Sequence, residues 1–247
     1  MQYIYHHFTE AYNSIIHTNW LLHANAEINQ EFVLLWTTEN VIFLGAKDAQ
    51  ITTKTALDTL PYPYLIRSSG GRAVVNDEGI VNLSYFTCEA LSVDEAYQKM
   101  KTMIENLLNI QTEAFEVVGS YCSGRFDLSI NGKKIAGMSQ RRYKNSIVVM
   151  AYISLYGDQQ KRSKIIQHFY QVAHDDTMPI DPNTMAVLNK GSLQEMLQHL
   201  HKKYELLEVA PFLRFYHSHP DIIHSMTQQF NKRQLLLEEN HYGKSTL

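Results

Sequence analysis

The two cysteines of the 247-residue sequence stand among different neighbours. Cys122 lies between Gly119-Ser120-Tyr121 and Ser123-Gly124-Arg125, in a segment rich in small and polar residues. Cys88 follows closely on Tyr85-Phe86, which is typical of a buried structural cysteine. Cys122 is therefore the candidate nucleophile, because a thiolate in a loop can reach a substrate. An unreactive loop cysteine remains the alternative.

A lysine-rich segment after Asn131-Gly132 is the second candidate. Asn-Gly is a strong β-hairpin signal, because both turn residues adopt positive φ. Side chains alternate along a strand, so Lys134, Ala136 and Met138 share one face. A lysine followed by small residues could lie along the floor of a narrow tunnel. Alternatively, Lys133 and Lys134 are solvated charges that protect a sheet edge.

Gly70-Gly71, in the segment from Arg67 to Asp77, is the third candidate. Two adjacent glycines between predicted strands let the backbone approach a ligand closely and expose N–H donors. A plain hairpin turn is the alternative interpretation.

The elements that must position these residues come in blocks of strands with few helices between them. The helix over residues 93–108 is the clearest, because Ser92 and Glu95 form a capping box in front of an apolar stripe. The other predicted helices cover 9–29, 161–172, 192–207 and 221–237. Short runs of β-forming residues predict strands at 32–36, 41–44, 64–66, 73–76, 80–86, 114–118, 126–130, 133–140 and 147–155. This order predicts an α+β fold with a mixed, mainly antiparallel sheet flanked by helices.

Composition argues against several classes of function. The formal net charge is −3, so the chain has no broad basic field for nucleic acid. No stretch approaches the ~18 apolar residues of a membrane span, and the first residues lack the features of a signal peptide. The clusters His6-His7 and His217-Ser218-His219 belong to no metal-binding pattern. With two cysteines and no disulfide framework, we expect a cytoplasmic protein that binds no metal.

Two long motifs carry a resemblance to a known family. They are the segment from Arg67 to Gly79 and the segment from Gly119 to Arg142. Together they resemble the catalytic domain of lipoate-protein ligases and biotin ligases. The resemblance is closer to the amidotransferase branch, the octanoyl-(glycine cleavage H protein):protein N-octanoyltransferases. It implies the lipoate/biotin protein ligase fold in residues 1–207, followed by a short helical extension in 208–247.

The resemblance implies a role for each candidate. Cys122 would attack an acyl amide and hold the acyl group as a thioester. Lys134 would be the cation that lowers the pKa of the thiol, since a nearby ammonium favours the thiolate. The residues implied to line the acyl channel are Arg67, Ser69, Gly70, Gly71, Ala73, Ala136, Gly137 and Ser139.

The resemblance also implies the partners. The acyl donor would be the glycine cleavage H protein, and the acceptors would be lipoyl domains of 2-oxoacid dehydrogenase E2 subunits. Arg72 stands where many ligases have a third glycine, which argues against an ATP-dependent ligase. No cofactor is expected. Ser123, Asn145 and Ser146 depart from the family pattern in the loops. Three alternatives remain: octanoyl-acyl carrier protein as donor, an ATP-dependent lipoate ligase, and a module that binds lipoyl domains without chemistry.

Overall fold

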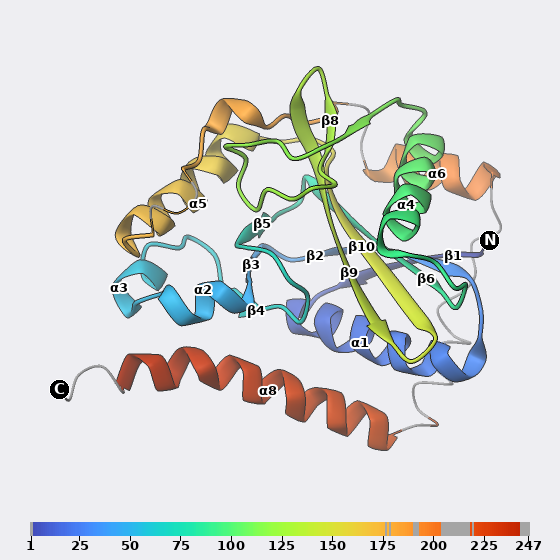
Figure 1. Cartoon of the computed structure of the whole chain (residues 1–247), viewed down its shortest axis with the longest axis horizontal. Helices are drawn as coiled ribbons and strands as arrows, with labels where there is room; N and C mark the ends of the chain where they lie inside the picture. The colour runs from blue at the N-terminus through green and yellow to red at the C-terminus, as the bar shows by residue number, and fades with distance from the viewer. Residues whose placement is uncertain are drawn as a thin grey trace.

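A large sheet forms the centre of the computed structural model, which describes residues 2–175, 177, 179–189, 193–203, 218 and 220–242. Within these residues its strand order is β1-β2-β6-β10-β9-β8-β7 (Figure 1). β1 runs parallel to β2, and the other neighbouring pairs are antiparallel, so the predicted mixed, mainly antiparallel sheet is confirmed. The strands are β1 (Gln2–Phe8), β2 (Phe32–Thr38), β6 (Ile80–Thr87), β7 (Glu113–Ala114), β8 (Leu128–Ile130), β9 (Lys133–Tyr143) and β10 (Ser146–Ser154).

A smaller sheet carries the glycine-rich segment. Its middle strand β3 (Val41–Leu44) pairs in parallel with β4 (Tyr64–Ile66) and antiparallel with β5 (Val74–Asn76). The loop with Gly70-Gly71 therefore joins the two outer strands and passes β3. Because β4 and β5 are not neighbours, this loop is not a plain hairpin turn.

Both faces of the large sheet are covered. Phe32 and Leu34 of β2 belong to a core shared with helix α1, and Val33 and Leu35 belong to a second core shared with helix α4. Successive side chains of a strand point to opposite faces, so a strand covered on both faces is apolar throughout. This is why residues 32–36 form an unbroken apolar run.

The helices flank the sheets as the sequence predicts. The predicted capping box of α4 is confirmed, since Ser92 Oγ accepts from Glu95 N and Glu95 accepts from Ser92 N. No helix in the described part of the chain is both long and apolar enough to cross a membrane. The helices are α1 (Ala11–Ile28), α2 (Ala46–Ile51), α3 (Lys54–Leu57), α4 (Val93–Leu108), α5 (Gln159–Val172), the 3-10 helix η1 (Pro182–Thr184), α6 (Leu193–Lys203) and α8 (Pro220–Tyr242).

Helix α8 lies along α1 and α2 at the edge of the molecule (Figure 1). Its Gln234 side chain accepts a hydrogen bond from Ile66 N (2.8 Å) and donates one to Ile66 O (3.0 Å). Gln234 thus takes the place of a neighbouring strand at the free edge of β4. The predicted division at residue 207 stays a prediction, because residues 204–217 lie outside the described part of the chain.

Some local predictions were wrong. Strand β1 was missed, and so were α2 and α3, which are too short to show a helical period. Residues 115–118 do not form a strand, because Phe115 N and Val117 N both donate to Asp127 and turn the chain into a loop. The ends of the predicted helix 192–207, Ser192 and 204–207, fall outside the described residues.

Candidate active site

The loop that carries Cys122 has an unusual backbone. Cys122 has φ of +50°, a left-handed conformation that is uncommon for residues other than glycine. Asp127 holds the loop in shape, because its Oδ2 accepts hydrogen bonds from Val117 N (3.3 Å) and Gly124 N (3.1 Å). The half-buried Cys122 side chain lies against the glycine-rich segment and lines a cavity.

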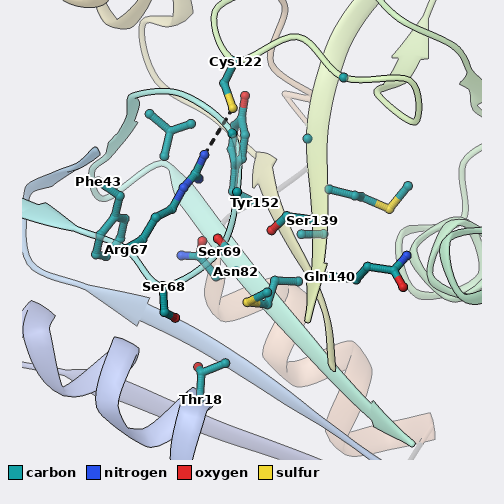
Figure 2. Close-up of a pocket in the computed structure, with 18 of the residues that line it drawn as sticks. Thr18, Phe43, Arg67, Ser68, Ser69, Asn82, Cys122, Ser139, Gln140 and Tyr152 are labelled. Carbon is teal, nitrogen blue, oxygen red and sulfur yellow. Dashed lines mark hydrogen bonds between the residues drawn. The ribbon is translucent and has the colours of Figure 1, made fainter. Parts of the chain in front are cut away.

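Two donors from the glycine-rich segment point at the Cys122 sulfur. Arg67 Nη2 lies 3.3 Å from Sγ, as the dashed line in Figure 2 shows, and Arg72 N lies 3.1 Å from it. Gly71 makes this approach possible. Gly71 has a φ of +97°, and a Cβ at this position would lie 2.8 Å from Sγ and 2.4 Å from Arg67 Nη2. The sulfur thus accepts from two N–H donors at once, one from a side chain and one from the backbone.

Arg72 holds the segment through its side chain. Its guanidinium forms ion pairs with Asp48 (3.2 Å) and Asp175 and lies over the Tyr170 ring. Tyr170 Oη also accepts from Ala73 N (2.8 Å) and donates to Asp48 (3.0 Å). Burial raises the pKa of Asp48, although the Gly45 N–H and the Arg72 charge oppose this shift. The network fixes the backbone N–H of Arg72 in front of the sulfur.

Lys134 lies on the other side of the Cys122 loop, fully buried on β9. Its Nζ donates to Tyr121 O (3.2 Å) and Cys122 O (2.7 Å) and lies 2.9 Å from Asp127 Oδ1. Burial raises the pKa of Asp127, and the Lys134 charge and two N–H groups partly offset the rise. An ammonium has three N–H donors, and these three acceptors engage all of them. The structure therefore places Lys134 at the carbonyl of Cys122 and Arg67 at its sulfur.

A cavity of about 370 Å³ begins at Cys122. In Figure 2, Cys122 and Thr18 lie at opposite ends of the residues drawn, with Arg67, Ser69 and Ser139 between them. Most of the predicted channel residues line this cavity, namely Arg67, Ser69, Gly70, Gly71, Gly137 and Ser139. Ala73 and Ala136 are fully buried and lie outside its lining. Neighbouring residues of a strand face opposite sides, so Ala136 and Gly137 do not both face one cavity.

Sequence reasoning missed several residues of the cavity. Asn76 and Asn82 both line it and exchange two hydrogen bonds of 3.2 and 3.1 Å, so each amide satisfies the other. Asn76 lies in the first motif, whereas Asn82 is one polar residue in a predicted strand. Aromatic residues on other strands also line the cavity, namely Trp36, Phe43 and Tyr152. Asp127 was missed as well, although it lies within the second motif.

The fold and this cysteine-centred cavity define a class of protein related to the lipoate ligases. Residues 10–208 match the family of the lipoyl protein ligase A/B catalytic domain, and the chain belongs to this family.

The chain is similar in sequence to two curated relatives. The chain is 37% identical to octanoyl-GcvH:protein N-octanoyltransferase of Anoxybacillus flavithermus, over 68% of this chain and 66% of that protein. It is 35% identical to lipoyl-GcvH:protein N-lipoyltransferase of Listeria monocytogenes, over 66% of this chain and 63% of that protein. The chain thus covers slightly less than two thirds of the length of these relatives.

Solved structures support the fold. A crystal structure of lipoate-protein ligase A bound with ATP superposes with a TM-score of 0.68 at 12% identity, over 95% of this chain and 93% of that one. A bipartite lipoate protein ligase from Thermoplasma acidophilum superposes with a TM-score of 0.62 at 13% identity, over 96% of each chain. The predicted lipoate-ligase type of fold is therefore confirmed.

Proposed function

We propose that this chain is an N-octanoyltransferase of protein lipoylation. It moves an octanoyl or lipoyl group from the lysine of glycine cleavage H protein to the lysine of lipoyl domains in 2-oxoacid dehydrogenase E2 subunits. It works in the cytoplasm, through a thioester on Cys122. One observation carries the proposal: the Cys122 sulfur receives two N–H donors at the edge of a cavity of about 370 Å³.

The chemistry divides one transfer between two proteins into two steps. The thiolate attacks the carbonyl carbon of the donor amide and forms a C–S bond. The C–N bond then breaks, and the lysine leaves as an amine that takes a proton from solvent. In the second step the lysine amine of the acceptor attacks the thioester, loses its proton to solvent and releases the thiolate.

The cavity suits an acyl chain held in this way. Aromatic and apolar side chains, Trp36, Phe43 and Met150 among them, line it together with hydroxyl and amide groups. A thioester on Cys122 would place the chain along these walls, where burial of apolar surface contributes roughly 25 cal/mol per Å². The names of the two relatives, one octanoyl and one lipoyl, support both groups as candidates.

The surroundings of Arg72 support a reaction without ATP. Its guanidinium is engaged by the carboxylates of Asp48 and Asp175 and stacks on Tyr170, so it is not free to bind a phosphate. We accordingly propose that the enzyme needs neither ATP nor a metal.

Intact-mass spectrometry tests the proposal. Enzyme mixed with octanoylated glycine cleavage H protein should gain the mass of one octanoyl group, and addition of an E2 lipoyl domain should remove it. Cys122→Ala should abolish the adduct, and Cys88→Ala should keep it. An adduct formed only from octanoyl-acyl carrier protein would overturn the choice of donor. Lipoylation that needs free lipoate and ATP and survives Cys122→Ala would overturn the mechanism.

A further inference from the structure

Three side chains of the cavity lining carry a buried polar atom without a hydrogen-bond partner among the described residues. These atoms are Thr18 Oγ1, Arg67 Nε and Tyr152 Oη. Thr18 lies at the end of the cavity opposite Cys122, whereas Figure 2 shows Tyr152 with its hydroxyl end toward Cys122. Arg67 is already held near the sulfur, because its Nη2 donates to Arg72 O (2.7 Å). Tyr152 is therefore the one of the three whose hydroxyl, its whole hydrogen-bonding capacity, is unused at the reacting end of the cavity.

Strand pairing places the Tyr152 ring beside the Cys122 loop. Tyr152 lies on β10 opposite Gly137 of β9, and a Cβ on Gly137 would lie 2.7 Å from Tyr152 Cε1. The missing side chain of Gly137 thus leaves room for the ring. Lys134 Nζ lies 5.8 Å from the centre of this ring and 2.7 Å from Cys122 O. The ring and the loop are therefore close neighbours across one lysine.

The Tyr152 hydroxyl stays protonated and can act as a donor. Tyr152 is 8% exposed, and burial raises its pKa well above the usual value. The nearby Tyr121, Cys122 and Asp127 raise the pKa further. The hydroxyl of Tyr121, in contrast, already accepts a hydrogen bond from Gln159 Nε2 (3.0 Å). A buried hydroxyl without a partner costs roughly 1–3 kcal/mol, so an acceptor that enters the cavity gains by pairing with Tyr152.

We propose that Tyr152 is a catalytic residue, whose hydroxyl donates a hydrogen bond to the carbonyl oxygen of the acyl group as that group joins and leaves Cys122. When the C–S bond forms, the π electrons of the carbonyl move onto its oxygen. The Tyr152 O–H donates to this oxygen and keeps its proton. When the C–N bond breaks, the electrons return to the carbonyl, and the amine takes a proton from solvent. A donor held where negative charge develops stabilises the transition state more than the bound substrate.

This role rests on the proposed acyl transfer through Cys122, but it does not depend on which protein donates the acyl group. The small ester p-nitrophenyl octanoate acylates a cysteine through the same kind of oxyanion and releases p-nitrophenolate. Iodoacetamide alkylates the same sulfur by displacement at a saturated carbon, so no oxyanion forms. The two reagents therefore separate an effect on the oxyanion from an effect on the thiol.

The rates of both reactions test the role in proteins that all carry Cys88→Ala, so that a single thiol reacts. In Tyr152→Phe we expect acylation by the ester, followed by p-nitrophenolate absorbance and intact mass, to fall at least about tenfold. Alkylation by iodoacetamide should stay at the rate of the parent protein. The control Tyr156→Phe removes a hydroxyl four residues along the chain and outside the cavity lining, and it should change neither rate.

Three results would overturn the role of Tyr152: unchanged acylation in Tyr152→Phe, an equal loss of both rates, or a parent protein whose Cys122 takes no octanoyl group from the ester. If Tyr152→Phe does not keep the parent circular dichroism spectrum, Tyr152→Met replaces it. The flexible methionine fills the space without a hydroxyl, and the same difference between the reagents is expected. Acylation by the ester but not by octanoylated H protein would refute the proposed function and leave the role of Tyr152 standing.

Discussion

The Lys134 ammonium and the Asp127 carboxylate form an ion pair of 2.9 Å that is closed to solvent. Lys134 binds the carbonyls of Tyr121 and Cys122, and Asp127 binds the N–H groups of Val117 and Gly124. The two side chains thus fasten the loop on both sides of Cys122. A loop with a left-handed Cys122 needs such support, because this conformation costs about 1 kcal/mol or more.

Removing one member of this pair should cost much stability. Lys134→Met leaves the Asp127 charge buried and unpaired, so we expect the free energy of unfolding to fall by about 3–5 kcal/mol. Urea unfolding followed by circular dichroism measures this change. Lys133→Met, at the exposed neighbouring position, should change it by less than about 0.5 kcal/mol.

The double variant separates lost charge pairing from lost packing. In Lys134→Met with Asp127→Asn no charge is left unpaired, so the double variant should be more stable than Lys134→Met alone. A double variant at least as unstable as the single one would show that the ion pair is not the source of the effect.

Gly71 should be irreplaceable where Gly70 is not. In Gly71→Ala the new methyl group would lie 2.8 Å from Cys122 Sγ, at a φ of +97° that alanine rarely adopts. We expect alkylation of Cys122 and formation of the acyl-enzyme to fall at least about tenfold, because the methyl group would displace the sulfur and the Arg67 guanidinium from their present positions. Gly70→Ala is the matched control, because nothing lies within 4 Å of a Cβ there. Equal rates in the two variants would contradict the close approach of Gly71 to the sulfur.

The sequence was sufficient to predict that Cys122 and most of the proposed channel residues lie together at one cavity. Cys122 and Gly71 lie in continuous motifs, and the strand blocks predicted a mixed, mainly antiparallel sheet, although β1 was missed. The sequence pattern did not predict contacts between segments that lie far apart in the chain. Arg67 and Cys122 are 55 positions apart, and Arg72 and Asp175 are 103 apart. A local pattern does not show which buried cation lies beside which acid.

The contacts of Lys134 illustrate the same limit. The sequence places it twelve positions after Cys122 and across a hairpin, which is compatible with contact to either the sulfur or the backbone. Whether Lys134 contacts the sulfur or the backbone depends on Asp127 and on the left-handed backbone at Cys122. Neither the orientation of a carboxylate nor a single positive φ leaves a signal in the residue pattern.

Gln234 should connect helix α8 to the active-site segment. Its amide binds both backbone groups of Ile66, the residue before Arg67. Gln234→Ala leaves a buried N–H and C=O without partners, so we expect a loss of about 2 kcal/mol in the free energy of unfolding. Gln229→Ala, at an exposed position of the same helix, should change stability little, because within the described part of the chain its amide bonds only to Ser225 one turn away. Equal effects of the two variants in urea unfolding would indicate that α8 does not support β4.

His17 should make the fold sensitive to acid. Burial, together with the charge of His6, lowers the pKa of His17 to about 4 from 6.5. The His17 ring packs edge-on against Phe8, with 5.3 Å between the ring centroids. Because the folded-state pKa is the lower one, the unfolded chain binds the proton more readily. The stability that comes from the neutral ring is therefore present above pH 6.5 and is lost as the pH falls toward 4.

The size of this loss follows from the two pKa values. Between pH 7 and pH 5 it amounts to about 2 kcal/mol in the free energy of unfolding. His17→Gln should lack this part of the decline, whereas His224→Gln, at an exposed position on α8, should keep it. Urea unfolding of the three proteins at both pH values measures the difference. If all three decline equally, another group titrates in this range and the burial of a neutral His17 does not govern acid stability.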